Sequence, residues 1–187
     1  MSAHRFHPTI LRAYDIRGIF EDTLTTGDAF AIGLSFISIQ KQRGLGNEVT
    51  VGRDGRLSSP ALAAALIDGL VAGGAQVSDI GCGPTPMLYF AAHELGSGGA
   101  IQVTGSHNPP THNGFKMVMG GLSFFGADIE ELGRVSAAGP DHTDDGGVVS
   151  RAIEEAYVDR LAAGAVATGL SVIWDCGNGA SGPATKK

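Results

Sequence analysis

The sequence lacks any apolar run that approaches the ~20 residues a membrane-spanning helix needs, and its N-terminal residues carry no apolar signal-peptide core. Positive charge is also scarce, since 13 Lys and Arg stand against 19 Asp and Glu and give a formal net charge of −6. This acidic balance argues against nucleic acid as the main partner. We therefore expect no membrane partner, no nucleic-acid partner and a cytoplasmic location.

Cysteine is limited to Cys82 and Cys176, which lie far apart and follow predicted strands. We expect them to be small buried residues rather than a disulfide. Glycine, by contrast, is abundant at 29 of 187 residues and falls mostly at element boundaries, which indicates many tight turns. A hydrophobic fraction of 43% and a charged fraction of 17% are typical of a globular protein rather than a disordered one.

Apolar and β-branched runs alternate along the chain with capped helical segments. The expected strands or extended segments are 10–18, 48–52, 75–80, 99–103, 115–119 and 170–174. The expected helices are 25–43, 60–72, 85–95, 128–137 and 153–163. This alternation predicts an α/β protein, a three-layer α/β/α fold. Its sheet should be mixed but mostly parallel, because 115–119 returns from the preceding loop like a hairpin.

The chain is predicted to contain one complete domain, residues 1–140. Residues 141–150 are polar and rich in Asp and Gly, so they are predicted to form a linker. Residues 151–187 hold one expected helix and one expected strand, too little to bury a core, and are predicted to be the incomplete start of a second domain. Within the first domain, a turn is expected at His112-Asn113-Gly114.

The stretch Thr104-Gly105-Ser106-His107-Asn108-Pro109-Pro110 leaves the buried strand 99–103, and its two prolines prevent a helix there. In open α/β sheets, ligand sites lie outside the carboxyl ends of the strands. Ser106 is therefore the leading candidate nucleophile. A phosphoserine, with roughly −1.5 to −2 charges, suits the stretch better than a hydrolase serine, because the GxSxG elbow is absent. The alternative is a turn serine that bonds its own backbone.

Polar side chains near Ser106 in the sequence can support phosphoryl chemistry. His107 can act as a general acid or base, or hold the phosphoryl group. Asn108 can donate to a phosphate or cap the turn. Lys116 lies on the strand leaving the loop and is either a cation within reach of Ser106 or a solvated edge lysine. A metal site built on His107 and His112 is disfavoured, because nothing nearby supplies a third ligand.

Three arginines lie at the ends of expected strands. Arg17 ends the first extended stretch, and Arg53 and Arg56 follow the strand 48–52. If those strand ends open toward Ser106, the guanidinium groups surround the same site, where they are suited to bidentate phosphate contacts. The alternative for each is an ion pair, with Asp15 or Asp54 as the nearest carboxylates in the sequence.

Taken together, these stretches resemble the α-D-phosphohexomutase family, in particular its bacterial phosphomannomutase/phosphoglucomutase branch. The resemblance rests on residues 12–18, 51–56, 104–110 and 113–116, which occur in the family's order. Residues 175–179, Asp-Cys-Gly-Asn-Gly, are similar to the strand end that opens the family's second domain. The residue sequence of the serine stretch favours the mannose/glucose branch over the phosphoglucosamine mutase branch, which stays an alternative.

The resemblance implies a phosphohexomutase that interconverts the 6-phosphate and 1-phosphate of mannose or glucose through a 1,6-bisphosphate intermediate. It implies that Ser106 is phosphorylated and binds Mg²⁺ through its phosphate. His107 and Lys116 would assist proton transfer and stabilise the phosphoryl group. Tyr14 and Arg17 would line the cleft, and by residue type Arg53 and Asn108 would join them in binding substrate phosphate.

The family pattern is only partly present. The family's four domains surround one cleft, and its Asp-rich Mg²⁺ loop lies in the second domain, yet no Asp-Gly-Asp-Gly-Asp pattern occurs in this chain. Without those carboxylates, Mg²⁺ binding should be weak or absent. We therefore expect an N-terminal fragment with negligible mutase turnover by itself. The alternative is a non-catalytic module that binds phosphosugars.

Overall fold

A computed structural model describes residues 3–143, 145–164 and 169–187. Its centre is a 7-stranded sheet. Six of the strands follow the order β1-β5-β4-β2-β3-β7, and the seventh, β6, pairs with β5. The strands are β1 (Ile16–Ile19), β2 (Glu48–Arg53), β3 (Gln76–Cys82), β4 (Gly99–Val103), β5 (His112–Met119), β6 (Leu122–Ser123) and β7 (Gly147–Ser150). The helices are α1 (Thr26–Gln42), α2 (Ser59–Ala72), α3 (Thr85–Glu94), α4 (Ala127–Ala138), α5 (Glu154–Ala162) and α6 (Gly182–Thr185).

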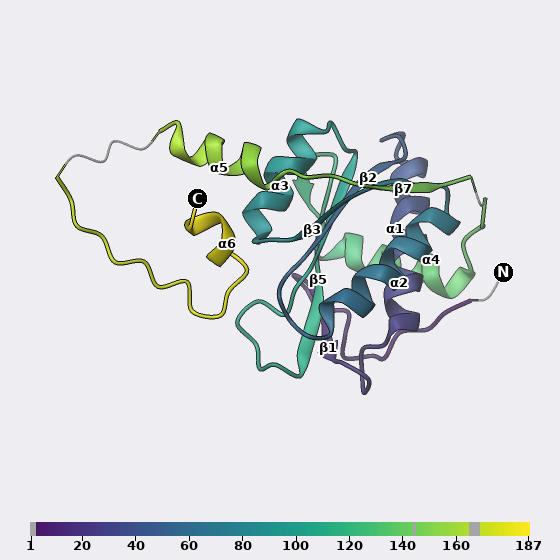
Figure 1. The fold of residues 1–187 in the computed structure, drawn as a ribbon. Helices are drawn as coiled ribbons and strands as arrows, with labels where there is room; N and C mark the ends of the chain where they lie inside the picture. The colour runs from purple at the N-terminus through teal and green to yellow at the C-terminus, as the bar shows by residue number, and fades with distance from the viewer. Residues whose placement is uncertain (1–2, 144, 165–168) are drawn as a thin grey trace.

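The sheet is mixed, and the predicted three-layer α/β/α fold is confirmed (Figure 1). Strands β4, β2, β3 and β7 pair in parallel, whereas β5 is antiparallel to both β4 and β1. Because β2, β3 and β4 run in the same direction, their carboxyl ends meet at one edge of the sheet. That edge is where the serine stretch begins, since β4 ends at Val103.

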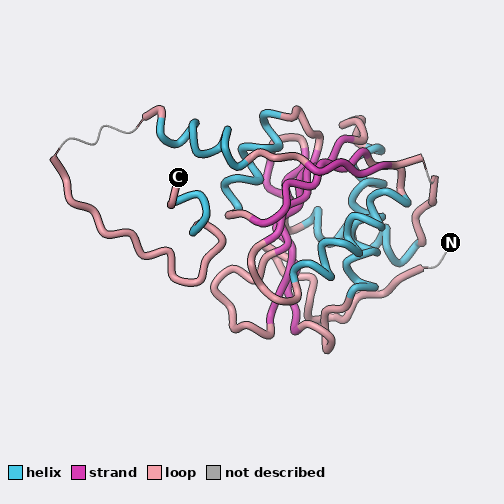
Figure 2. The backbone as a smooth tube through the Cα atoms, in the orientation of Figure 1, coloured by secondary structure: helices cyan, strands magenta, loops and turns pink. Residues whose placement is uncertain are grey.

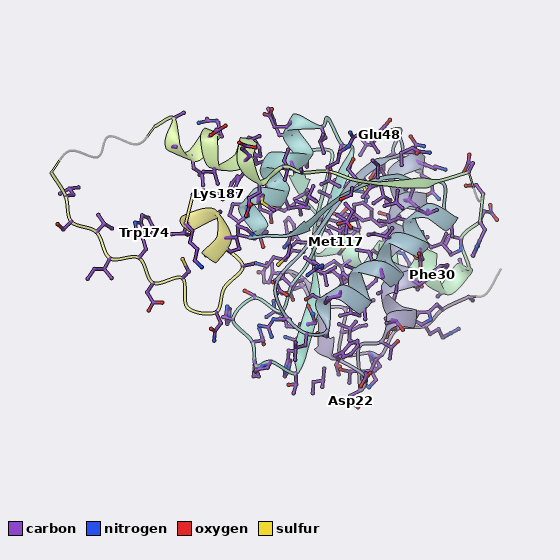
Figure 3. All side chains as sticks on the ribbon, in the orientation of Figure 1. Asp22, Phe30, Glu48, Met117, Trp174 and Lys187 are labelled. Carbon is purple, nitrogen blue, oxygen red and sulfur yellow. The ribbon has the colours of Figure 1, made fainter. Side chains whose placement is uncertain are left out.

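Two layers of helices cover the sheet. Helices α1, α2 and α4 enclose the larger core, which includes the fully buried Phe36 and Phe115. Helices α3 and α5 lie over the opposite face, where Tyr157 packs on Phe90 with ring centroids 5.7 Å apart. Figure 3 shows Met117 among the densely packed side chains of the sheet.

Helix α1 begins where the sequence predicts it. Thr25 accepts a hydrogen bond from the backbone N–H of Asp28, whose side chain bonds back to Thr25, so both parts of a capping box are present. The helix then crosses α2 at very short range. A Cβ added at Gly69 would lie 2.0 Å from the carbonyl oxygen of Phe30, so only glycine fits there.

The turn expected at His112-Asn113-Gly114 is wrong, because these residues begin strand β5. The fully buried amide of Asn113 donates to the hydroxyls of Ser58 and Ser59 at 2.8 and 2.9 Å. A Cβ on Gly114 would lie 2.1 Å from the carbonyl oxygen of Ile16 in the neighbouring strand. Long-range packing therefore requires Asn113 and Gly114 at these positions. A rule that uses only neighbouring residues cannot tell such a pair in a strand from an Asn-Gly turn.

The C-terminal part departs further from the predicted elements. Residues Gly147–Ser150, expected within the linker, pair in parallel with β3 as strand β7. The strand expected at 170–174 does not form, since no other described residues pair with it. Ile173 is 97% exposed and Trp174 is 75% exposed, on an extended segment that leaves the body of the molecule (Figures 2 and 3). A strand needs a partner for its backbone N–H and C=O groups, and none of the strands in the described part of the chain pairs with this run. The boundary between two domains stays a prediction.

Cys82 and Cys176 are both free thiols. Cys82 is exposed at the carboxyl end of β3, so its expected burial is wrong, and Cys176 is half-buried. Among the described residues, none of the helices combines the length and the apolar character needed to cross a membrane.

Candidate active site

A cavity of about 460 Å³ opens at the sheet edge where β2, β3 and β4 end. This volume lies within the ~300–1,000 Å³ typical of small-molecule pockets. The loops after these three strands form most of the wall, which comprises residues 54–57, 83–85 and several members of the serine stretch. Residues 178–180, from the segment before α6, close the remaining side. The position agrees with the ligand site expected for an open α/β sheet.

Ser106 lies in the wall of this cavity in a left-handed backbone conformation, with φ of 53°. For a residue with a Cβ atom this conformation costs roughly 1–2 kcal/mol. The turn is held by two local bonds. Ser106 N–H donates to the Thr104 hydroxyl at 2.9 Å, and Asn108 N–H donates to the Gly105 carbonyl at 3.0 Å. Thr104 is buried while Ser106 is exposed, so the turn presents the serine hydroxyl on a fixed base.

His107 lies within reach of the serine hydroxyl for proton transfer. Its Nδ1 lies 3.3 Å from Ser106 Oγ. This distance is slightly longer than a good hydrogen bond, as is common in sites without bound ligand. With the proton on Nε2, Nδ1 can accept the hydroxyl proton of Ser106.

Asp54 ties the end of β2 to the serine turn. Its Oδ2 accepts from the backbone N–H of Gly105 at 3.1 Å. Its Oδ1 accepts from the Ser59 hydroxyl at 2.5 Å and from the backbone N–H of Arg56 at 3.0 Å. The carboxylate therefore joins β2, the start of α2 and the serine turn.

Arg56 does not face the cavity as a free cation. Its guanidinium donates to four backbone carbonyls of the serine loop, those of Pro109 at 2.7 Å, His112 at 3.0 Å, Ser106 at 2.9 Å and Asn108 at 2.8 Å. Its Nε also bonds Asp54 Oδ2 at 3.2 Å. Of the three arginines proposed to surround Ser106, this one lies against the loop itself.

Lys116 and Tyr14 lie at a neighbouring cavity of about 330 Å³ rather than in the wall around Ser106. Tyr14 is 82% exposed and stacks on Phe125 with ring centroids 6.3 Å apart. Tyr89 lines the same cavity, and the partial burial of its side chain raises the pKa of its hydroxyl. The structure thus groups Lys116 with aromatic side chains. In the register of β4 and β5, Lys116 lies opposite Gln102, which lines the cavity around Ser106.

Arg17 and Arg53 lie outside the lining of both cavities. Arg17 is buried in β1 and forms an ion pair with Asp15. Its Nε is a buried donor without a hydrogen-bond partner among the described residues. Arg53 ends β2 and is half-buried. Of the substrate-binding residues predicted from the sequence, the cavity wall contains Asn108.

Gln102 and Asn178 line the cavity although the sequence analysis does not select them. Gln102 is 1% exposed, and its Nε2 donates to the Gly83 carbonyl at 2.9 Å, which joins β4 to the loop after β3. The sequence contained one indication of this role, because Gln102 is the single polar side chain in the otherwise apolar strand 99–103. For Asn178 the signal was its glycine-flanked loop, but loop composition alone does not place a segment beside another loop.

The described residues do not fit a Mg²⁺ site. None of them forms a group of three or more His, Cys, Asp or Glu side chains placed to hold a metal. Asp54 is the acidic residue in the wall around Ser106, and it is already bonded to Gly105, Ser59 and Arg56. Mg²⁺ prefers an octahedral shell of oxygens, which one serine oxygen does not supply.

Known proteins of one family match the chain over most of its length. The domain family described as phosphoglucomutase/phosphomannomutase, alpha/beta/alpha domain I, matches residues 8–138. The phosphomannomutase/phosphoglucomutase of Pseudomonas aeruginosa is 43% identical over 179 residues, which cover 93% of this chain and 38% of that protein. The phosphoglucomutase of Neisseria gonorrhoeae is 40% identical over 176 residues, covering 92% of this chain and 38% of that protein.

A solved structure agrees with these matches. The phosphoglucomutase/phosphomannomutase family protein from Burkholderia thailandensis superimposes with a TM-score of 0.80 at 41% identity, covering 85% of this chain and 36% of that chain. This chain therefore spans less than two fifths of the length of these three relatives. The matched residues include the serine stretch and all three strands that end at the cavity. The chain belongs to the phosphoglucomutase/phosphomannomutase family, the α-D-phosphohexomutases.

Proposed function

We propose that this chain supplies the phosphoryl-carrying serine of a phosphohexomutase that interconverts the 6-phosphate and 1-phosphate of mannose or glucose. Ser106 is the proposed carrier, and a hexose 1,6-bisphosphate is the proposed intermediate. One observation carries the proposal most directly. The Ser106 hydroxyl is exposed on a firmly held turn, in the wall of a cavity large enough for a hexose phosphate.

The proposed step is a phosphoryl transfer from the bisphosphate to the serine. Ser106 Oγ attacks phosphorus, the bond from phosphorus to the sugar oxygen breaks, and the proton of the hydroxyl passes to His107 Nδ1, 3.3 Å away. The sugar oxygen takes up a proton as it leaves. In the full cycle, phosphorylated Ser106 first transfers its phosphoryl group to the free hydroxyl of a hexose monophosphate, which gives this bisphosphate. The other phosphoryl group of the bisphosphate then passes to Ser106 by the step above, so that the isomeric monophosphate leaves and the phosphoserine is restored.

The remaining site residues have proposed binding roles. Asn108 donates from the cavity wall to the sugar phosphate. Lys116 and Tyr14 hold the part of the substrate that extends into the neighbouring cavity, with Lys116 as the cation for developing phosphoryl charge. Arg17 and Arg53 would need to reorient to contact a phosphate, since both lie outside the two cavities.

A second candidate function is phosphosugar binding without catalysis. It is favoured by one observation, the lack of a metal-ligand group among the residues that the structure describes. The chain covers 38% of the length of the Pseudomonas aeruginosa relative, so groups that complete the chemistry in that enzyme need not be present here. Under this candidate Ser106 would contact the phosphate but would not accept it.

The two candidates separate in one experiment with glucose 1,6-bisphosphate as the probe. The purified chain is incubated with the bisphosphate, and intact mass spectrometry followed by peptide sequencing locates any phosphate adduct. We expect one phosphate on Ser106 and none in Ser106→Ala. Amide shifts in a ¹H–¹⁵N spectrum report binding around 54–57 and 104–110 in the same samples.

Each outcome decides between the readings. An adduct on Ser106 supports the phosphoryl carrier. Shifts around the cavity without an adduct support the non-catalytic binder. Neither shifts nor an adduct, in a chain whose spectrum shows it to be folded, would contradict both. In a coupled assay with glucose 1-phosphate and catalytic bisphosphate, we expect negligible turnover from this chain alone, and appreciable turnover would contradict that expectation.

A further inference from the structure

We infer that Arg56 and Asp54 form a positioning pair that holds the serine turn in its active shape, and that Arg56 is not a ligand for the substrate phosphate. The inference deepens the proposed function, since it concerns how Ser106 is presented. It begins with the donors of the guanidinium. Arginine has five side-chain N–H groups.

All five N–H groups of Arg56 have partners inside the protein. Nε donates to Asp54 Oδ2, and the two terminal nitrogens donate to the four loop carbonyls at 2.7–3.0 Å. The Arg56 side chain is 16% exposed. A phosphate could bind it only by displacing loop carbonyls, which would release the turn. All the hydrogen-bond donors of the guanidinium are therefore engaged by the serine loop and by Asp54.

Glycine at position 105 makes room for this support. A Cβ on Gly105 would lie 2.4 Å from both Cζ and Nε of Arg56 and 2.7 Å from the His112 carbonyl oxygen. The Gly105 N–H also donates to Asp54. The Gly-Ser pair of the motif thus has two separate tasks: Gly105 admits the guanidinium, and Ser106 presents its hydroxyl.

The Arg56–Asp54 pair also orients one backbone N–H group, that of His107. The described chain has no cis peptide bonds, so the N–H of His107 points opposite to the Ser106 carbonyl. Arg56 draws that carbonyl toward itself, which turns the His107 N–H away from the guanidinium. Arg56 also holds the carbonyls of Asn108 and Pro109. Each of these carbonyls is followed by a proline, so neither peptide bond contains an N–H group. The His107 N–H therefore points to the side of the turn opposite the guanidinium.

Amide hydrogen exchange tests the positioning role without any substrate. Four amides of the loop are hydrogen-bonded, those of Gly105, Ser106, Asn108 and His112. We expect Arg56→Ala to raise their exchange rates at least about tenfold, while Ile101 in the adjacent strand changes less than about twofold. Arg160→Ala, an exposed arginine on α5, is the matched control and should change neither set.

A charge-conserving variant separates positioning from phosphate binding. Arg56→Lys keeps the positive charge but cannot span four carbonyls. We expect it to loosen the loop almost as much as Arg56→Ala and to slow phosphate uptake by Ser106 from glucose 1,6-bisphosphate at least about tenfold. Asp54→Asn should loosen the same amides, and it serves as a second variant if Arg56→Ala does not fold.

The results can overturn the inference independently of the proposed function. Loop exchange within about twofold of the parent in both Arg56→Ala and Asp54→Asn would refute the positioning role. Normal phosphate uptake in Arg56→Lys despite a loosened loop would show that charge alone suffices. If the parent chain takes up no phosphate, the proposed phosphoryl transfer is contradicted, and the exchange rates still decide the positioning role.

Discussion

Substitution of Asn113 tests whether its buried hydrogen bonds connect strand β5 to helix α2 beside the serine site. Its side chain is fully buried and makes three hydrogen bonds. Nδ2 donates to Ser58 and Ser59, at the start of α2, and Oδ1 accepts from the backbone N–H of Gly114 at 2.9 Å. Asn113→Ala removes all three bonds and leaves the Gly114 N–H buried beside a new cavity.

The expected loss follows from these contacts. A net hydrogen bond contributes about 0.5–1.5 kcal/mol, and an orphaned buried donor costs about 1–3 kcal/mol. We expect Asn113→Ala to lower the free energy of unfolding by about 3 kcal/mol. In a domain of this size that loss lowers Tm by about 6–12 °C. A turn residue, as the Asn-Gly signal suggested, would lose far less.

Urea unfolding followed by far-ultraviolet circular dichroism measures this loss as a shift in midpoint at unchanged slope. Asn47→Ala is the control, because the half-buried Asn47 makes one side-chain bond to a backbone carbonyl, that of Gly74 at 3.1 Å. We expect a loss of at most about 1 kcal/mol from it. If Asn113→Ala lost no more than Asn47→Ala, the strand anchor described for Asn113 would be refuted.

Two further predictions concern the helix crossing and the C-terminal segment. Gly69→Ala would place a Cβ 2.0 Å from the Phe30 carbonyl oxygen, so we expect a loss near the upper end of about 1–3 kcal/mol in the same titration. Gly164→Ala meets no atom within 4 Å and should stay within about 0.5 kcal/mol of the parent; equal losses would contradict the close helix contact. Trp174, the single tryptophan, is 75% exposed, so its fluorescence should match that of solvent-exposed indole and be freely quenched by acrylamide. A blue-shifted, protected emission would show instead that the segment is covered, for example by a second copy of the chain.

The parts of the fold that depend on local interactions could be predicted from the sequence. The capping box of Thr25 and Asp28 spans three residues, and both of its bonds are present. Alternating apolar runs fixed the order of strands and helices, because each element must bury one face whatever its partner. The position of Ser106 followed in the same way, since a serine directly after a buried parallel strand reaches the carboxyl edge of the sheet.

The parts that depend on distant partners could not be predicted. Asn113 and Gly114 look like a turn locally, yet their partners on α2 and β1 are found only in the folded chain. The run 170–174 has the composition of a strand, but composition does not supply a partner strand. For Arg56 the sequence left open a phosphate contact or an ion pair with Asp54. The ion pair is present, but the sequence neighbours of Arg56 do not reveal that four loop carbonyls converge on it.

The bonds around the serine turn outweigh the strain within it. The left-handed conformation of Ser106 costs roughly 1–2 kcal/mol, whereas a single hydrogen bond to a charged group contributes about 1.5–3 kcal/mol. Asp54 and Arg56 supply several such bonds to the turn. The turn is therefore ordered during folding, before a ligand arrives, and a sugar phosphate that reaches Ser106 need not spend binding energy to order it. By the same reasoning, loosening Asn113 should disturb the site as well as the fold, because Asn113 and Asp54 both bond Ser59.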